Sequence, residues 1–363
     1  MLAVLSIVGG DVIHLALAQL SGGFFTPVAF SFGWVAYSFQ SLMALVGAQK
    51  LMPESDYPAI VVNGRNGYVR ANRSWILGRI LRDFDFWKPP AVEDEVRRIL
   101  DEAERADALH SVDVIFNHPP RPRPPRRERA GLCISIFSTA SHPPAGTPTH
   151  DLLFYSGIAT TVVQLGIASI PCALWNQWLI LMITACGILL ALASGALPQW
   201  KEEKWMSRRN AKTVILTEGN GAQHAVVILG RQGALNLEDL ASGNTRKKAL
   251  LHTKIFSTVL AFLWIALLIT VSGLTRDSWY LLAVGGLGMA QNVLVAAAPR
   301  RPEAFGLHLQ FERVIGNRSV MNALKALEDQ YPCLGASLVP IFFPGRLRQD
   351  EKDYWEQKEQ QQR

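Results

Sequence analysis

Only one carboxyl group lies within the long apolar stretches of this sequence, and a histidine follows it three residues later. A helix would place Asp11 and His14 on the same face. Burial in an apolar cavity raises the pKa of a carboxyl group, which would keep Asp11 protonated at neutral pH. Such an acid could protonate an alkene or an epoxide, with His14 orienting it or returning the proton. The alternative is that both side chains only bond to a neighbouring helix and support packing.

A group of aromatic residues follows this pair in the sequence. Phe30, Trp34 and Tyr37 are spaced at i, i+4 and i+7, which places them on one face of a helix. Aromatic faces stabilise cations, so a wall of them beside a proton donor would suit a carbocation and would bind substrate. Ordinary packing or an aromatic belt at the membrane interface is the alternative for these residues.

The absence of several well-known catalytic motifs limits the reactions that this sequence could catalyse. The sequence has no Asp-Asp-x-x-Asp or Asn-Asp-x-x-Asp motif in or beside an apolar stretch, so the usual magnesium ligands for ionising a prenyl diphosphate are missing. It also lacks a Gly-x-Ser-x-Gly nucleophile elbow and a His-Glu-x-x-His pair. We therefore expect neither a metal nor a cofactor, and acid catalysis in an apolar pocket is the enzymatic chemistry that remains.

The elements that would position these residues are membrane-spanning helices. The chain has 363 residues, of which 49% are apolar and 18% charged, and the apolar residues cluster in runs near the roughly 20 residues that cross a bilayer. The runs are Phe24 to Val46, Leu152 to Trp175, Trp178 to Leu197, Ile255 to Thr275 and Trp279 to Ala298, with a weaker sixth at Met1 to Leu20. For this sixth run, a signal peptide cleaved after Ala18 is the alternative to a retained helix.

The basic residues predict the orientation of these helices. Of the 36 Lys and Arg residues, all except Arg276 lie between or after the apolar hairpins. The positive-inside rule places these segments and the C-terminus in the cytosol, and this placement explains the net charge of +6 without a nucleic-acid partner. The predicted parts are transmembrane hairpins at 1–46, 152–197 and 255–298, and cytosolic segments at 47–151, 198–254 and 299–363.

The cytosolic segments contain short patterns of both helix and strand. Asn-Gly turns between apolar stretches predict β-hairpins at 59–71 and 213–229, and strand candidates lie at Val112 to Phe116 and Leu132 to Phe137. Trp75 to Trp87 predicts an amphipathic helix at the membrane interface, with Arg79 and Arg82 on its polar side. The expected fold is therefore a membrane all-α bundle of about six helices with a small cytosolic α+β cap.

Four blocks of this sequence resemble a known family. GGDVIHLALAQLSGG, PVAFSFGWVAYSF, NGYVRANRSWILGRILRD and YPCLGASLVPIFFPG are similar to fungal integral-membrane terpene cyclases of meroterpenoid pathways, of the macrophorin and ascofuranone type. The resemblance implies metal-independent cyclisation of a lipophilic, farnesylated substrate in secondary-metabolite biosynthesis. It transfers no site residue to this chain.

The residues and the resemblance together lead to one hypothesis and one main alternative. In the first, Asp11 protonates a prenylated substrate, His14 supports it, and Phe30, Trp34 and Tyr37 line the cavity, in the endoplasmic reticulum membrane. In the second, the chain is a non-catalytic multi-pass membrane adaptor whose working surface is the cytosolic cap. The second hypothesis predicts that substitutions at Arg79 or Arg82 impair the function of the protein and that substitutions at Asp11 do not.

Overall fold

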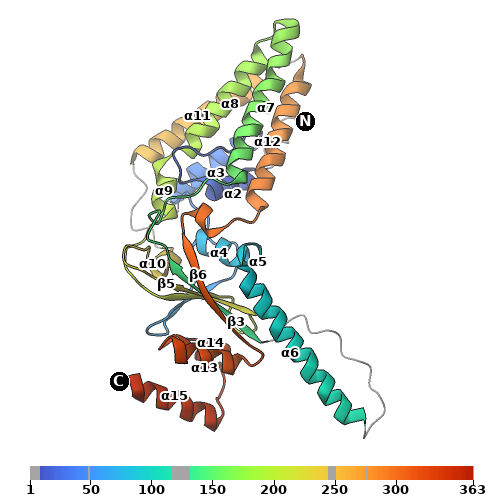
Figure 1. Cartoon of the computed structure of the whole chain (residues 1–363). Coiled ribbons are helices and arrows are strands. Elements are labelled where there is room, and N and C mark those ends of the chain that lie inside the picture. Colours follow the sequence, from blue (N-terminus) through green and yellow to red (C-terminus); the bar gives the residue numbers. More distant parts are fainter. Residues whose placement is uncertain (1–8, 48–49, 116–130, 244–250, 275, 363) are drawn as a thin grey trace. The chain divides into compact units, whose positions relative to one another are not determined.

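The computed structural model of the chain describes residues 9–47, 50–115, 131–243, 251–274 and 276–362 (Figure 1). These residues fold into two compact units, each assembled from three separate stretches of sequence. The helical unit takes its residues from Met1–Glu54, Gly146–Met206 and Asn244–Leu307, and the α+β unit from Ser55–Ala145, Ser207–Gly243 and His308–Arg363. The stretches of the α+β unit fall within the three segments that the sequence predicts as long loops.

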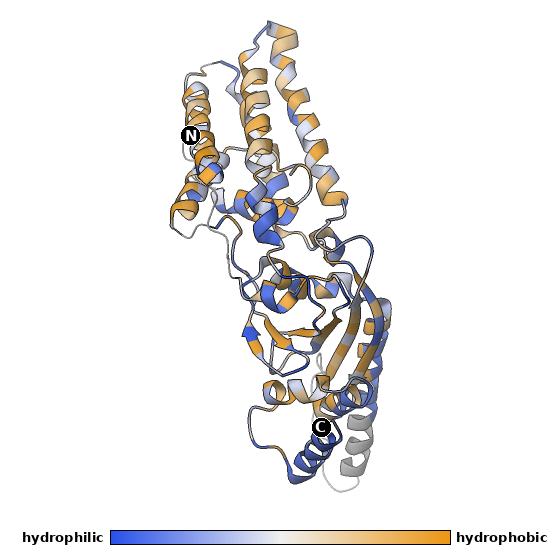
Figure 2. Ribbon diagram, turned by 90° about the vertical axis from the view of Figure 1, so that its left-hand side faces the viewer, coloured by the Kyte–Doolittle hydropathy of each residue, from blue (hydrophilic) through white to orange (hydrophobic). Residues whose placement is uncertain are grey.

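Four helices of the helical unit are long and apolar enough to cross a membrane. They are α7 (Leu152–Trp175), the stretch Leu179–Lys204, which comprises α8 (Leu179–Gly195) and the short α9 (Pro198–Lys204), α11 (Leu251–Ser272) and α12 (Ser278–Ala297). Their exposed faces carry large apolar side chains, and Figure 2 shows this part of the chain mostly in the colour of hydrophobic residues. Membrane character and four of the predicted helices are therefore supported.

The predicted count of six spanning helices is not confirmed. The run Phe24 to Val46 is wrong as one helix, because only α3 (Trp34–Gly47, 14 residues) is helical and residues 26–31 are not. At 1.5 Å per residue α3 measures about 21 Å, short of the ~30 Å that a spanning helix needs. In the weaker run the described helix is α2 (Gly10–Leu20, 11 residues), and residues 1–8 lie outside the described part of the chain.

The neighbouring helices in this unit are not those that three separate hairpins would have. Helix α7 packs against α8, as predicted, and also against α12. Helix α11 packs against α3 and α8, while α12 packs against α2 and α7. The short helices α2 and α3, which also contact each other, therefore take up positions beside the long ones.

The α+β unit is built on a six-stranded sheet with strand order β2-β1-β4-β5-β3-β6. All neighbouring strands are antiparallel except β3 and β5, which are parallel. The strands are β1 (Ile60–Asn63), β2 (Val69–Ala71), β3 (Leu132–Thr139), β4 (Val214–Thr217), β5 (His224–Leu229) and β6 (Leu309–Asn317). Both predicted hairpins and the predicted strand at Leu132 are confirmed.

Two other expectations for this unit need correction. The strand predicted at Val112 to Phe116 is wrong for residues 112–115, which belong to helix α6 (Pro90–Ile115), and Phe116 lies outside the described residues. Strand β6 was not predicted, although its long pairing with β3 places it at one edge of the sheet. The register between β3 and β6 shifts at Ile136 and Phe137, so Glu312 of β6 has no partner on β3. This β-bulge interrupts the alternation of apolar and polar residues along β6 that usually indicates a strand in a sequence.

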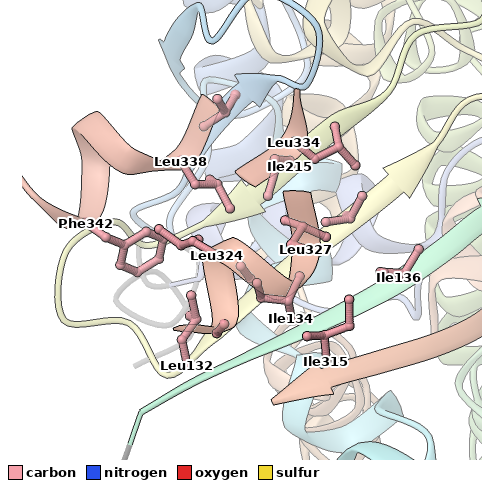
Figure 3. Close-up of a cluster of buried hydrophobic side chains, with 14 residues drawn as sticks. Leu132, Ile134, Ile136, Ile215, Ile315, Leu324, Leu327, Leu334, Leu338 and Phe342 are labelled. Atoms are coloured by element: carbon pink, nitrogen blue, oxygen red, sulfur yellow. The ribbon is translucent and has the colours of Figure 1, made fainter. Parts of the chain in front are cut away.

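Helices α13 (Val320–Gln330) and α14 (Leu334–Phe342) close the core of the α+β unit (Figure 3). Leu324 and Leu327 of α13 pack with Ile134 and Ile136 of β3, and Leu338 of α14 belongs to the same buried cluster. Burying apolar surface stabilises a folded protein by about 25 cal/mol per Å², so this cluster gives the α+β unit a hydrophobic core of its own. The polar C-terminal segment forms a further helix, α15 (Gln349–Gln362).

The predicted interfacial helix is part of the folded unit. Helix α4 (Trp75–Arg82) is followed by α5 (Phe84–Trp87), and residues Trp75 to Leu81 are all buried, so α4 has no exposed apolar face to rest on a bilayer. Arg79 is only 1% exposed; its guanidinium lies 4.0 Å from the Trp75 ring and 2.9 Å from the Asp56 carboxylate. A buried cation stacked on an aromatic ring and paired with a carboxylate is part of the architecture of this unit.

Candidate functional site

The structure does not bury Asp11 inside the protein. This side chain is exposed, and its Oδ1 accepts a hydrogen bond of 2.9 Å from Nε2 of Gln40 on α3. His14 is half-buried, and its Nε2 donates to the carbonyl oxygen of Leu51 over 2.6 Å. The two residues share α2, but each bonds to a different partner, and the described residues do not enclose Asp11 in an apolar cavity.

The three predicted aromatic residues do come together, around a tryptophan that the sequence argument missed. Trp264 of α11 stacks on Phe30 with ring centroids 6.2 Å apart and on Trp34 at 5.4 Å. Trp34 in turn meets Tyr37 edge to face at 5.4 Å. Because these rings cover one another's faces and are all buried, their arrangement favours the packing interpretation. A tryptophan in the middle of an apolar run carries no signal that would have indicated this role.

Non-helical backbone enters the helical unit at residues 26–31, which we call the non-helical segment. Asn292 of α12 holds it with both ends of its side-chain amide: Oδ1 accepts from the Ala29 N–H at 3.1 Å, and Nδ2 donates to the Ala29 carbonyl at 3.0 Å. Gln164 of α7 donates to the carbonyls of Phe30 at 2.7 Å and Val284 at 2.8 Å. These amides replace the hydrogen bonds that a helix would have supplied.

Glycines on the surrounding helices make room for this segment. A Cβ atom at Gly288 of α12 would overlap the carbonyl oxygen of Phe30, and one at Gly157 of α7 would overlap that of Pro27. At Gly187 of α8 a Cβ would meet the Phe30 ring. In a bilayer, non-helical backbone is tolerated only where protein buries it, and glycines of three long helices provide that burial here.

A buried lysine fixes the end of α2. Nζ of Lys204 donates to the carbonyls of Ala18 at 2.9 Å, Gln19 at 3.3 Å and Ser21 at 2.6 Å. These carbonyls lie at the C-terminus of α2, where the helix dipole favours a cation. The ammonium thus uses all three of its protons, and the role of Lys204 is structural.

The α+β unit contains a cleft of about 600 Å³, and this cleft is the candidate site of the molecule. It lies where the β1–β2 turn, the segment before β4 and the α13–α14 connection meet. Its walls carry two cations, three asparagines, a tyrosine and a cysteine, together with apolar side chains. The lining residues are Asn63, Gly64, Arg65, Asn66, Asn210, Ala211, Lys212, Thr213, Leu229, Tyr331, Pro332, Cys333 and Leu334.

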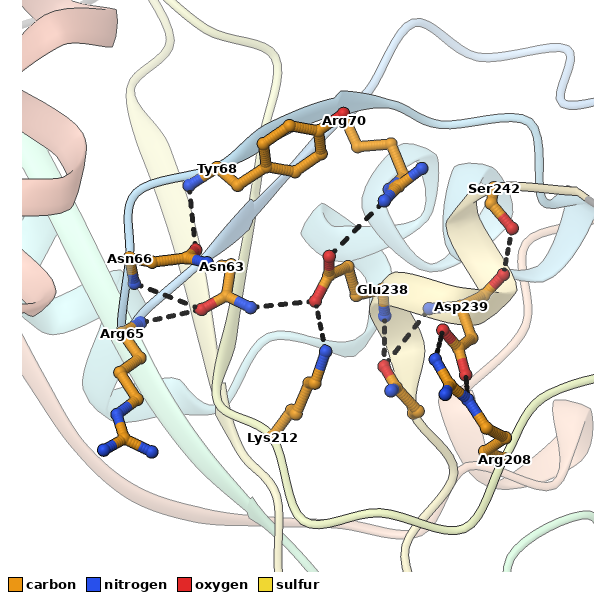
Figure 4. Close-up of polar contacts among 11 residues, drawn as sticks. Asn63, Arg65, Asn66, Tyr68, Arg70, Arg208, Lys212, Glu238, Asp239 and Ser242 are labelled. Atoms are coloured by element: carbon orange, nitrogen blue, oxygen red, sulfur yellow. Dashed lines mark hydrogen bonds and ion pairs between the residues drawn. The ribbon is translucent and has the colours of Figure 1, made fainter.

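Asn63 organises the turn at the edge of the cleft (Figure 4). Its Oδ1 accepts from the backbone N–H groups of Arg65 at 2.9 Å and Asn66 at 3.3 Å, which fixes the turn after β1. Its Nδ2 donates to Oε2 of Glu238 on α10 (Leu237–Ala241) at 2.8 Å. One side chain therefore ties the shape of the turn to a buried carboxylate.

Glu238 is the common partner of three residues around the cleft. Besides Asn63, its carboxylate binds Nζ of Lys212 at 2.8 Å and the guanidinium of Arg70 at 3.5 Å. Burial pushes the pKa of Glu238 upward, but the hydrogen bonds from Lys212 and Asn63 and the Lys212 charge outweigh it, so the pKa lies below its usual value. Glu238 is therefore ionised at neutral pH and holds this wall in place.

The cleft itself is electropositive. Arg65 is exposed, and among the residues that the structure describes no side-chain partner is found for its guanidinium. The lining contains no carboxylate, because Glu238 lies behind Lys212. The N-terminus of α14 adds little to this field, since the Cys333 and Ala336 N–H groups already donate to Glu328. Such a cleft can bind an anion, and its lining also carries the ionisable side chains of Lys212, Tyr331 and Cys333.

The sequence argument recognised the stretch Asn63 to Gly67 only as a hairpin turn. The signal for this site is an asparagine at the start of a turn that also carries arginine, because the asparagine side chain fixes the backbone of the arginine. Within the described ranges, no group of three or more His, Cys, Asp or Glu residues could hold a metal ion.

Comparisons with known proteins identify no relative. No family model, no curated protein and no solved structure matches this chain. The function is therefore argued from the geometry of the chain itself.

Proposed function

We propose that this chain is a non-catalytic, membrane-anchored binding protein, in which the helical unit is the anchor and the α+β unit recognises a small ligand in its cleft. The single observation that carries the proposal is the cleft. It lies within a unit that has its own core, and its wall is organised by the Asn63–Glu238 hydrogen bond rather than by chance surface packing. Its volume falls within the range of small-molecule sites in proteins.

The charge distribution supports an orientation for this anchor. The loops that supply the α+β unit carry most of the basic residues, so the positive-inside rule favours a cytosolic position for this unit. We place the four apolar helices in the endoplasmic reticulum membrane, with the long loops and the C-terminus on the cytosolic side.

Blocking the cleft tests the proposal. Asn210 is exposed and lines the cleft, so Asn210→Trp is expected to fill the cleft without disturbing the core. The measurement is the melting temperature of the full chain in detergent with 1 mM sugars, amino acids, nucleosides, organic acids or organic phosphates. A ligand at 100 times its Kd stabilises the folded state by about 2.7 kcal/mol, which raises the melting temperature by a few degrees.

The matched control is Asn220→Trp, an exposed asparagine in the β4–β5 turn that does not line the cleft. We expect one compound class to stabilise the unsubstituted chain and the Asn220→Trp protein, and to leave the Asn210→Trp protein unchanged. A chain that no class stabilises, or a shift that survives in Asn210→Trp, would refute the proposal.

Terpene cyclisation is a second candidate that rests on the sequence resemblance, although the stacked rings of Phe30, Trp34 and Trp264 favour packing. In this mechanism Asp11 protonates a farnesylated substrate while His14 supports it. The exposed position of Asp11 means that lipid or substrate, rather than this chain, must exclude water from the acid.

Asp11→Asn distinguishes the two candidates. Loss of the acid should lower cyclisation by at least 100-fold if Asp11 is the proton donor, since general acid catalysis contributes about 10²–10⁴-fold. The assay follows the product formed from a farnesylated phenol or its epoxide in microsomes. Full activity of a well-expressed Asp11→Asn protein would rule out this assignment.

A further inference from the structure

We propose that the cleft of the α+β unit binds an organic phosphate, with the guanidinium of Arg65 and the ammonium of Lys212 on the phosphate group. This inference rests on the proposed function, because it names the chemical class of the ligand for the same cleft.

The charges around the cleft favour an anion with several acceptor oxygens. Arg65 and Lys212 are the two charged residues of the lining, and both are cations. A guanidinium presents a planar fork of donors that matches two phosphate oxygens, and an ammonium supplies a compact charge for a third.

Arg65 is held by its backbone before any ligand arrives. The Asn63 side chain accepts from the Arg65 N–H at 2.9 Å, and the next turn residue, Asn66, accepts from the Tyr68 N–H at 3.1 Å. Because the backbone of the turn is already ordered, binding costs less conformational entropy than it would on a floppy loop.

Lys212 can donate a hydrogen bond to a ligand and keep its bond to Glu238. Its ammonium has three protons, and one is directed to Glu238 at 2.8 Å. Glu238 also accepts hydrogen bonds from Asn63 and Arg70, so its carboxylate keeps two other partners when Lys212 turns partly toward a phosphate. Phosphate binding therefore does not require a buried carboxylate to lose all its partners.

The remaining lining suits the organic part of such a molecule. Leu229, Pro332 and Leu334 offer apolar surface, and the Tyr331 ring adds an aromatic face. The exposed amides of Asn66 and Asn210 can donate to neutral oxygens. A cleft of about 600 Å³ is much larger than an inorganic phosphate, and is within the size range of metabolite sites.

Titration calorimetry of the full chain in phosphatidylcholine nanodiscs tests the inference. The probes are AMP, ribose 5-phosphate and glycerol 3-phosphate, with adenosine and inorganic phosphate as partial ligands. We expect at least one organic phosphate to bind, adenosine not to bind, and inorganic phosphate to bind more weakly. Arg65→Gln should weaken binding by about tenfold to 100-fold, because hydrogen bonds to charged groups contribute about 1.5–3 kcal/mol. Arg65→Lys should retain part of the affinity.

Arg346→Gln is the matched control, since Arg346 is exposed and lies outside the cleft. It should bind as tightly as the unsubstituted chain; equal weakening in both Gln variants would indicate nonspecific attraction and overturn the site. A second set of nanodiscs contains phosphatidic acid, which identifies a lipid headgroup as the source if it displaces the soluble probe.

The outcomes also separate this inference from the proposed function. If no phosphate probe binds but another compound class stabilises the chain in a manner that Asn210→Trp abolishes, the ligand class is wrong and the binding function stands. If no compound of any class binds, both are wrong.

Discussion

A Gly288→Ala protein is expected to be much less stable to heating than the unsubstituted chain, whereas Gly286→Ala is expected to be at least as stable. A Cβ at Gly288 would overlap the carbonyl oxygen of Phe30 and crowd the Gln164 amide, while a Cβ at Gly286 meets nothing within 4 Å. The obstacle at Gly288 is backbone that Asn292 and Gln164 hold in place, so it cannot move aside cheaply. We expect a loss of about 3 kcal/mol or more, at the upper end for overpacking.

The measurement is the fraction of monodisperse protein that survives heating in detergent, followed by size-exclusion chromatography. Gly286→Ala controls for the general effect of alanine in a helix, which is favourable by about 1 kcal/mol. Equal stability of the two variants would mean that residues 26–31 do not lie against α12.

Asn292→Leu should be nearly as damaging. The substitution leaves the Ala29 N–H and the buried Ser31 hydroxyl without their Asn292 partner, whereas the Ala29 carbonyl keeps a hydrogen bond from Nε1 of Trp34. Each unsatisfied buried group costs about 1–3 kcal/mol, so the expected loss is about 2–6 kcal/mol. The same heating assay in detergent measures this loss.

The neighbouring residue provides the control. Gln291 makes one described hydrogen bond, from Nε2 to Oγ of Ser156 at 2.7 Å. Bonds between side chains of membrane helices average about 0.6 kcal/mol, so Gln291→Leu should have a small effect. A larger loss for Gln291→Leu than for Asn292→Leu would contradict the role assigned to Asn292.

The parts of the fold that the sequence predicted are those with local signals. Uncharged runs of about 20 residues gave α7, α8, α11 and α12, and turn residues between apolar stretches gave the β1–β2 and β4–β5 hairpins. Asn236 caps the short helix α10, because its side chain accepts from the Glu238 and Asp239 N–H groups.

The missed parts depend on contacts between distant residues. Phe24 to Val46 has the composition of a spanning helix, but its first third is held in a non-helical form by Asn292, 263 residues away from Ala29. Hydropathy carries no information about such a partner. Gln164 donates both to the non-helical segment, at the Phe30 carbonyl, and to the Val284 carbonyl of α12, whereas Asn292 bonds to the segment at Ala29 and Ser31.

The candidate site also combines features that the local sequence indicates with features that depend on contacts between distant residues. Asp11 stood out because it is the one acid in an apolar run, yet its exposure depends on how α2 packs, which the sequence does not state. The cleft residues come from three stretches of chain that meet only in the folded unit: the β1–β2 turn, the segment before β4 and the α13–α14 connection. The positions of Arg65 and Lys212 in the sequence do not indicate that both residues line the same cleft.

The order of the strands has a consequence for biosynthesis. Strand β3 lies between β5 and β6, and β6 follows the last long apolar helix in the chain. While the ribosome is still making α11 and α12, β3 therefore has an open edge and its Leu132, Ile134 and Ile136 lack the cover of α13 and α14. Until translation ends, a nascent chain depends on chaperones to keep this edge from pairing with other strands, and a prematurely terminated chain is a natural target for degradation.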